Sequence, residues 1–313
     1  MIPVEHSKGI SPDSPLRDWV ALEESGDIPE ATFKRLAEHP LYDTIVREFM
    51  QGSMVLAAAD SRIDDIFKDM GRYGAAVWAV YLHFTGGLTL PRLKEICARS
   101  GVLSPGRARA LLIYLQLLGY VKKMPKTEPG PARYAPSDAL LHALKEHARL
   151  GLTAMAAVEP VFQVVLDHFD TPAVFQTYIV KFGEGAFKSV VAIDSNRPIW
   201  PVFLMRNAGM QLLYCLLLAE ADARDRKDPP ARPRISIASL ARQLNVARSH
   251  VLHVLRLAEK DKLLSRTESG EIILSDDFRR TAGRALQLQL LGCAFSGAYA
   301  YEYISASGLL PSS

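Results

Sequence analysis

Two stretches of the sequence carry side chains suited to reading DNA. In the stretch from 247 to 260, Arg, Ser and His recur at positions that face outward if the stretch is a helix. Arginine can donate two hydrogen bonds to the major-groove edge of guanine, and smaller polar side chains can bond to other base edges. The residues that we expect to contact DNA in and around this stretch are Arg242, Arg248, Ser249, His250, His253, Arg256 and Arg266.

The earlier stretch, from 104 to 135, offers a set of its own, which we call the first set because it comes first in the chain; the set around residues 242–266 is then the second set. Arg107 and Arg109 stand near the start of a helical pattern, where a helix that enters the major groove presents its side chains to the bases. The lysines that follow are suited to phosphates, which position a protein on DNA. The residues expected to contact DNA here are Ser104, Arg107, Arg109, Lys122, Lys123, Lys126 and Arg133.

The distribution of charge supports DNA binding more than the net charge of +3 does. Residues 88–135 hold nine Lys and Arg against two Asp and Glu, and residues 231–267 hold eight against two. Residues 1–40, in contrast, hold four against eight. Positive charge on both candidate DNA elements is what binding to a polyanion requires.

Other kinds of site have weaker support. His250 and His253 are three residues apart, which suits a metal, but no third ligand is near them in the sequence and DNA contacts explain them more simply. Residues 182–189 lack the full spacing of a phosphate-binding loop, so we interpret them as a helix with packing glycines. The sequence has no catalytic motif that we recognise. We therefore expect no enzyme, no cofactor and no metal.

The second set requires the elements of a winged helix-turn-helix. Apolar residues recur at helical spacing in its second helix and mark the buried side, and a polar turn around Gly270 predicts the hairpin called the wing. The inward residues are Val251, Val254, Leu255 and Ala258. The expected elements are a strand at 235–237, helices at 239–244 and 247–260 with a turn at 245–246, and the hairpin at 265–274.

The first set has the same order of elements. Ser104 can cap the second helix, and Pro105 suits its first position, where a missing N–H costs nothing. Ala108, Leu111 and neighbouring leucines face inward. The expected elements are a strand at 89–90, a helix at 91–100, a turn at 101–102, a helix from 105, a wing at 122–135 and a helix at 138–157 capped by Ser137. Four outward positions are nevertheless apolar, which leaves open that one site is covered or has lost its function: Ile113, Tyr114, Leu252 and Leu257.

The two sets belong to a repeated sequence. Ile45-Val46-Arg47 and the Asp60-Ser61 pair recur at the same spacing as Ile179-Val180-Lys181 and Asp194-Ser195, and Ser137-Asp138 recurs as Ser275-Asp276. We therefore expect a mainly helical fold with small β wings, in which tandem winged helix-turn-helix domains arose by internal duplication. The expected parts are an acidic leader (1–40), a first domain (41–157), a connecting segment with a packed helix (158–174) and a second domain with a C-terminal helix (175–313).

The first motif resembles a known family. Leu103-Ser104-Pro105-Gly106-Arg107-Ala108, continuing through Leu115 to Leu118-Gly119-Tyr120-Val121, is similar to the recognition helix and wing entry of the MarR family of winged-helix regulators. The resemblance implies binding to near-palindromic double-stranded DNA, in the manner of a dimer, and release of the DNA by a small aromatic effector. The chain lacks the Asp-x-Arg of that family's wing and carries both motifs in one polypeptide.

Composition and the remaining residue types set the broad class. An apolar fraction of 49% with 23% charged residues is typical of globular proteins, and no apolar run is long enough to span a membrane, so we expect a cytoplasmic protein with no membrane partner. Cys97, Cys215 and Cys293 are far apart and odd in number, which favours buried thiols over disulfides. Six aromatic residues either line an effector cavity or belong to the core: Trp78, Tyr81, Tyr114, Trp200, Phe203 and Tyr214.

These patterns together predict a DNA-binding transcriptional regulator. Two fused winged-helix domains would act as a pseudo-dimer, or the chain would pair again as a homodimer. The half-sites should differ, because Arg107 and Arg109 suit guanine whereas the later helix offers Arg, Ser and His. Two alternatives stay open: a plasmid-type replication initiator, which also carries two winged helices, and a protein-interaction scaffold that does not bind DNA.

Overall fold

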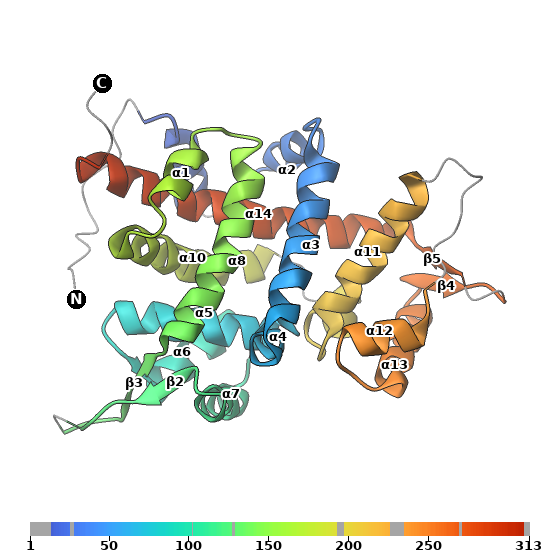
Figure 1. Cartoon of the computed structure of the whole chain (residues 1–313), viewed down its shortest axis with the longest axis horizontal. Helices are drawn as coiled ribbons and strands as arrows, with labels where there is room; N and C mark the ends of the chain where they lie inside the picture. Colours follow the sequence, from blue (N-terminus) through green and yellow to red (C-terminus); the bar gives the residue numbers. More distant parts are fainter. Residues whose placement is uncertain are drawn as a thin grey trace. The chain divides into compact units, whose positions relative to one another are not determined.

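The chain packs as two compact units that interleave along the sequence. The computed structural model describes residues 14–25, 28–101, 103–126, 129–192, 197–225, 235–268 and 271–309, and these are mainly helical with a few short antiparallel strands (Figure 1). The first unit is drawn from residues 1–49, 74–192 and 287–313, and the second from 50–73 and 193–286. The packing units therefore combine segments that are separated in the sequence, and the domain limits predicted above stay a prediction.

The first unit contains the first helix-turn-helix and most of the long helices. Three of its helices, α3, α5 and α14, also contribute a segment to the second unit. Its elements are α1 (Arg17–Ser25), α2 (Glu30–Ala37), α3 (Tyr42–Ala59), α5 (Met70–Phe84), β1 (Leu88–Thr89), α6 (Leu90–Ser100), α7 (Pro105–Leu117), β2 (Val121–Lys123), β3 (Arg133–Pro136), α8 (Asp138–Ala156), α9 (Phe162–Asp167), α10 (Pro172–Ala192) and α14 (Asp276–Ala306).

Aromatic side chains build the core of the first unit. The ring of Trp19 in α1 lies 6.1 Å from that of Phe162 in α9 and 6.0 Å from that of Phe295 in α14. All three side chains are buried, and pairs at this distance add to the stabilisation from burial alone. The leader and the connecting segment therefore both belong to this core, and the helix predicted in the connecting segment is present as α9.

A small sheet lies beside α6 and α7. Its strand order is β1-β3-β2, all antiparallel, with Leu88 opposite Tyr134 and Val121 opposite Pro136. The hairpin of β2 and β3 projects beside α7 in Figure 1. The strand, the two helices and the wing expected from the sequence are thus all present in this unit, within one or two residues of the predicted limits.

Residues 182–189 lie within α10, as predicted, and do not form a phosphate-binding loop. A Cβ atom at Gly183 would lie 2.7 Å from the Cβ of Tyr81, a separation that real side chains do not adopt. No atom lies within 4 Å of the corresponding position at Gly185. Gly183 is therefore a packing glycine, because it lets α10 approach α5 closely.

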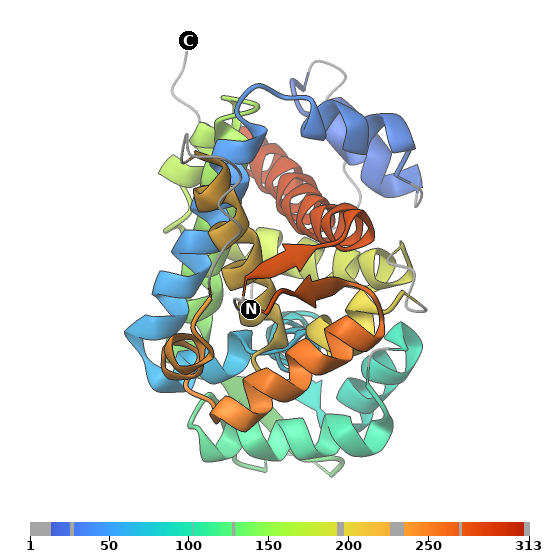
Figure 2. The ribbon, with the colours of Figure 1, turned by 90° about the vertical axis from the view of Figure 1, so that its right-hand side faces the viewer.

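The second unit contains the second helix-turn-helix. Figure 2 shows its two strands side by side, with α13 running below them. Its further elements, besides parts of α3, α5 and α14, are α4 (Ser61–Phe67), the π-helical turn η1 (Trp200–Leu204), α11 (Gly209–Asp225), α12 (Ile237–Gln243), α13 (Arg248–Lys260), β4 (Leu264–Arg266) and β5 (Ile272–Leu274).

Both apolar and polar contacts hold the second unit together. The rings of Phe203 and Phe278 lie 5.4 Å apart and are fully buried. In the same unit, buried Gln211 of α11 donates a hydrogen bond of 2.6 Å to Asp64 of α4. Lys68 pairs with the same carboxylate at 3.0 Å, so the buried charges of α4 are compensated.

The strand predicted at 235–237 is wrong. Ser236 is extended, neither it nor Ile235 pairs with a strand among the described residues, and Ile237 already begins α12. The Ser236 hydroxyl accepts a hydrogen bond from the backbone N–H of Ser239, which makes Ser236 the N-cap of the helix. A capping serine between two isoleucines produces the same alternating pattern as a short strand.

Serine caps begin two long helices at the repeated Ser-Asp pairs. The Ser137 hydroxyl accepts from the N–H of Leu140 at the start of α8, and that of Ser275 accepts from the N–H of Phe278 at the start of α14. The cap predicted at Ser137 is confirmed. The turn residues Val102 and Gly270, and the repeat residues Asp194 and Ser195, lie outside the described residues.

The three cysteines are free and buried, as predicted. Burial raises the pKa of the Cys97 thiol to about 12 and that of the Cys293 thiol to about 11. Of the six aromatic residues considered for a cavity, four are buried in the cores of their units, namely Trp78, Trp200, Phe203 and Tyr214. No helix among the described residues is sufficiently long and apolar to cross a membrane.

Candidate nucleic-acid interface

The second motif is built around a tight turn between α12 and α13. Helix α12 ends at Gln243 with Leu244 as its C-cap, and Asn245 takes a left-handed conformation with φ of 49°, which Asn tolerates better than most residues. The N–H of Val246 then donates to the carbonyl of Ala241 at 3.0 Å. The turn predicted at Asn245-Val246 is confirmed, and it brings the two helices of the motif together.

Helix α13 has one apolar and one polar face. The four predicted inward residues are all buried, with Val254, Leu255 and Ala258 fully so. On the opposite side, a polar stripe recurs at steps of four, three and four residues and is exposed to solvent along the whole helix. This polar stripe consists of Ser249, His253, Arg256 and Lys260.

The start of α13 lacks a side-chain cap. Its N-cap residue is Ala247, which has no group to accept a hydrogen bond from the first turn. The first N–H groups of a helix have no partner within the helix, and they carry a partial positive charge. This helix start is therefore suited to an anionic group such as a phosphate.

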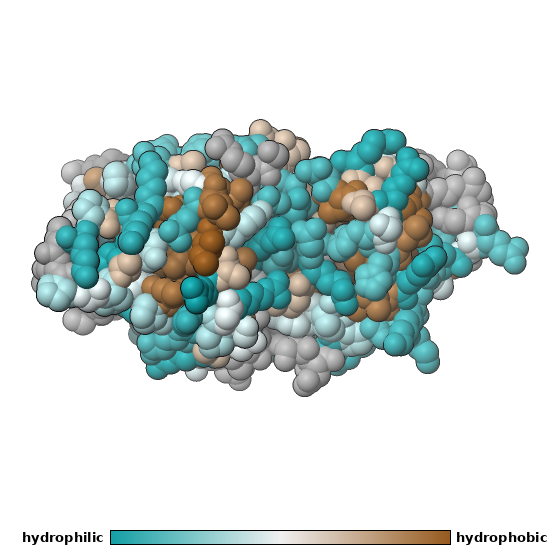
Figure 3. Space-filling view, turned by 90° about the horizontal axis from the view of Figure 1, so that it is seen from below, coloured by the Kyte–Doolittle hydropathy of each residue, from teal (hydrophilic) through white to brown (hydrophobic). Residues whose placement is uncertain are grey.

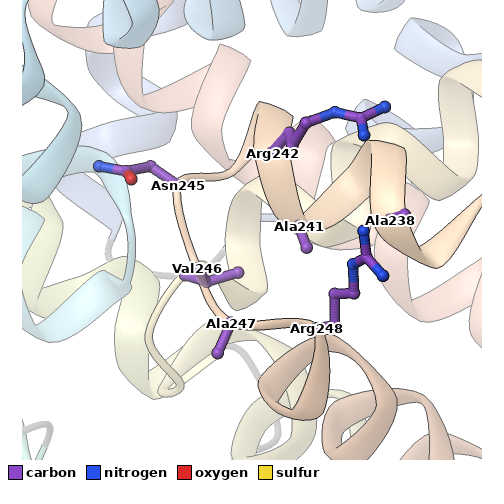
Figure 4. Close-up of a pocket in the computed structure, with 7 residues that line it drawn as sticks. All are labelled: Ala238, Ala241, Arg242, Asn245, Val246, Ala247 and Arg248. Carbon is purple, nitrogen blue, oxygen red and sulfur yellow. The ribbon is translucent and has the colours of Figure 1, made fainter.

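An open hollow of about 580 Å³ lies at this helix start, between α12 and α13. In Figure 4 the side chain of Arg242 extends from α12 and that of Arg248 from the start of α13, toward the same side of the hollow, while Asn245 points away. Two guanidinium groups beside an uncapped helix start concentrate positive charge. The lining residues are Ala238, Ala241, Arg242, Asn245, Val246, Ala247 and Arg248.

Two residues predicted to contact DNA are engaged by the protein itself. His250 is half-buried, and its Nε2 lies 2.7 Å from the backbone carbonyl of Asn207, so this nitrogen donates a hydrogen bond within the second unit. Arg266 donates two hydrogen bonds to the carboxylate of Glu259. These contacts hold both side chains in place within the second unit and leave each with fewer donors for DNA, so DNA contact by His250 and Arg266 stays a prediction.

The pairing with Arg266 also shifts the pKa of Glu259. Hydrogen bonds from Arg266 hold the pKa of Glu259 below its ordinary value, so the pair stays charged throughout the neutral range. The other residues predicted in this motif, Arg242, Arg248, Ser249, His253 and Arg256, are exposed. Sequence reasoning missed Lys260, although its helical spacing from Arg256 was a usable signal.

The first motif also places its predicted basic residues on the surface. The Ser104 hydroxyl accepts a hydrogen bond from the N–H of Arg107 at 3.3 Å and so caps α7, as predicted. Arg107 and Arg109 are exposed. The wing residues Lys122, Lys123, Lys126 and Arg133 are exposed as well. The first unit thus has a basic wing and a capped, basic helix start.

His250 and His253, three residues apart on α13, have the spacing of metal ligands. Within the described ranges, no three His, Cys, Asp or Glu side chains gather in a way that could hold a metal ion. Of these two histidines, His250 is engaged by a backbone carbonyl and His253 is exposed.

No protein-family model, curated protein or solved structure matches the chain.

Proposed function

We propose that the protein binds double-stranded DNA through its second helix-turn-helix and acts as a regulator of transcription. The observation that carries this proposal is the exposed polar stripe of α13, which lies opposite a fully apolar buried stripe. A helix with this division of faces can be held rigidly on its unit while its polar side enters the major groove.

We further propose roles for the basic residues around the hollow beside the polar stripe. Arg242 and Arg248, together with the uncapped start of α13, bind a backbone phosphate and so fix the register of the helix. Arg256 and His253 then face base edges, where arginine favours guanine. Lys260 lies at the end of the helix and contributes to the attraction of the polyanion.

The first motif is proposed to take part through its basic wing. Lys122, Lys123 and Lys126 reach phosphates, and Arg107 and Arg109 stand at the start of α7. We propose further that the two motifs arose by duplication and form a pseudo-dimer of the MarR-like kind, so that one chain meets two unequal half-sites. The small aromatic effector implied by that resemblance is not part of the proposal, because four of the six aromatic candidates are core residues.

Binding to sequences selected from a random DNA pool tests the proposal. Affinity is measured by fluorescence anisotropy at several salt concentrations, for the native protein and for Arg248→Ala and Arg256→Ala. We expect Arg248→Ala to weaken binding to all sequences and to reduce the salt slope by about 1, and Arg256→Ala to cost about 1–3 kcal/mol at one base position.

A matched control separates local contacts from net charge. Arg280, in the same unit on α14, is exposed and forms an ion pair with half-buried Asp277, so Arg280→Ala removes one positive charge that lies on neither α12 nor α13. We expect it to leave affinity within about twofold of the native value. The proposal is wrong if no sequence is enriched, or if Arg280→Ala weakens binding as much as Arg248→Ala does.

A further inference from the structure

The second helices of the two motifs can be compared residue by residue. The buried residues of α7 are Ala108, Leu111, Leu112 and Leu115, and those of α13 are Val251, Val254, Leu255 and Ala258. Each residue of the second group lies 143 positions after its counterpart in the first (251 − 108 for the first pair). The two helices therefore bury equivalent faces, and their exposed faces can be aligned at the same offset.

The exposed faces differ in chemistry at the four positions that align with the polar stripe. Where α13 presents the polar stripe, α7 presents a stripe with no polar side chain, which we call the apolar stripe. Ile113 is 46% exposed and Leu117 is 81% exposed, so this stripe is not covered by the first unit. The apolar stripe consists of Gly106, Ala110, Ile113 and Leu117. In the sequence alignment these residues correspond to Ser249, His253, Arg256 and Lys260, in that order.

Apolar surface of this kind is visible on the molecule. Figure 3 shows brown apolar surface among teal hydrophilic surface on the side of the first unit on which α7 lies. Met124, which follows β2 in the wing, is also 46% exposed. Single exposed apolar residues are ordinary, but an exposed stripe along one helix favours a binding surface.

The spacing of the apolar stripe specifies the shape of its partner. Steps of four, three and four residues are the spacing of the seam through which two helices pack side by side. The seam is about 16 Å long, since its first and last residues are eleven positions apart and each position adds about 1.5 Å. Its first half is formed by Gly106 and Ala110, which are small, and its second half by Ile113 and Leu117, which can insert between side chains of a partner helix.

Charge specifies the sides of that partner. Arg107 and Arg109 flank the first half of the apolar stripe, and residues 101–126 contain no Asp or Glu. A second copy of α7 packed on this seam would bring like charges together, which is unfavourable. A helix with carboxylates beside its apolar residues has the complementary charge.

We propose that the apolar stripe of α7 is a docking site for an amphipathic helix of a partner protein, one whose apolar seam is flanked by Asp or Glu. Docking of such a helix in a groove or along a seam buries apolar surface, and the flanking charges select the partner. The first motif then carries a protein-binding stripe on α7 in addition to its basic wing, whereas the second carries the polar stripe that is proposed to read DNA. The inference stands on α7 alone and does not require that α13 binds DNA.

A designed peptide tests this proposal. The probe is a fluorescent helix-forming peptide of about 20 residues with Leu at steps of four and three and Glu on both sides of the Leu seam. We expect it to bind the full-length protein and to bind more weakly as salt increases. Two control peptides, one with Ser in place of Leu and one with Lys in place of Glu, should not bind.

Matched variants locate the binding surface. Ile113→Arg combined with Leu117→Lys gives α7 the residue types that α13 carries, and we expect it to weaken peptide binding at least about tenfold. Leu41→Lys changes another exposed apolar residue of the first unit, 44% exposed, and should leave binding unchanged. Circular dichroism and thermal unfolding should be the same for all three proteins, because the altered side chains are exposed.

Three results would overturn the proposal. The first is an absence of peptide binding, or binding that the double variant does not change. The second is a concentration-dependent dimer in sedimentation that the double variant dissociates, which would assign the stripe to a second copy. The third is loss of DNA affinity in the double variant for sites with thymine but not for the same sites with uracil, which would assign the stripe to thymine methyl groups. DNA binding by the native protein and by Arg248→Ala is measured separately, so failure of the DNA-binding proposal can be distinguished from failure of the docking proposal.

Discussion

Arg266 in β4 donates two hydrogen bonds to the two carboxylate oxygens of Glu259 in α13, at 2.6 and 2.7 Å. The pair ties the first strand of the second wing to the helix that carries the polar stripe. Both side chains are partly shielded, at 26% and 29% exposure. A paired, two-bond geometry of this kind fixes orientation better than a single ion pair does.

Breaking this pair should loosen the wing and lower stability. We expect Glu259→Gln to reduce the free energy of unfolding by about 1 kcal/mol in urea denaturation, and Arg266→Gln to add little further loss in the double variant. Because the pKa of Glu259 is lowered in the folded protein, its contribution is present above the ordinary carboxyl pKa and is lost as pH falls through the folded pKa. Strictly additive losses in the double-mutant cycle would contradict the pairing.

Ala247 should show a conflict between stability and DNA binding. Ala247→Asp supplies the missing cap of α13, and we expect it to raise the free energy of unfolding by about 1 kcal/mol. Under the proposed function it should also weaken DNA binding, because the carboxylate would face the phosphate. Ala247→Ser provides a cap without charge and should keep the affinity. Undiminished DNA affinity in the aspartate variant, measured by anisotropy, would place the hollow outside the DNA contact.

Buried His147 should make stability depend on pH. Burial lowers the pKa of this α8 histidine from 6.5 to about 4, beside the ring of Phe49 at 5.6 Å. The unfolded chain therefore binds a proton first, and the contribution of the neutral ring is complete above pH 6.5 and is lost as pH falls toward 4. The loss amounts to about 3 kcal/mol.

Two variants on the same helix check this expectation. His147→Leu should flatten the dependence of the free energy of unfolding on pH between 6.5 and 4. His142 is 69% exposed, so His142→Leu should keep the native slope. If both variants retain the slope of the native protein, His147 is not the group responsible.

The two glycines of α10 should respond oppositely to alanine. Gly183→Ala places a Cβ against the Cβ of Tyr81, which cannot move without the backbone of α5, and we expect a loss of about 1–3 kcal/mol in unfolding free energy. Gly185→Ala meets no atom within 4 Å, so the higher helix propensity of Ala should give a gain of about 0.5–1 kcal/mol. Equal effects in urea denaturation would show that the close approach of α10 and α5 is absent.

The helices of both motifs could be predicted because their signals are local. Ser104 and Pro105 mark the start of α7 within four residues, and the inward leucines recur every three or four positions. The strand at 235–237 failed for a related reason, since Ser236 serves as a cap and none of the strands in the described ranges pairs with it. A pattern of three residues does not distinguish the two cases.

Local sequence was sufficient for the caps at Ser104 and Ser137, for the inward and outward faces of α7 and α13, and for the basic charge on both motifs. Only the folded chain decides which outward groups remain available: His250 bonds to the carbonyl of Asn207, 43 residues away, and Arg266 to Glu259 across the wing. It also decides that the leader, α9 and α14 share one core. Caps and periodicity act within about one helical turn. Contacts between distant residues depend on how the whole chain packs, which no short pattern encodes.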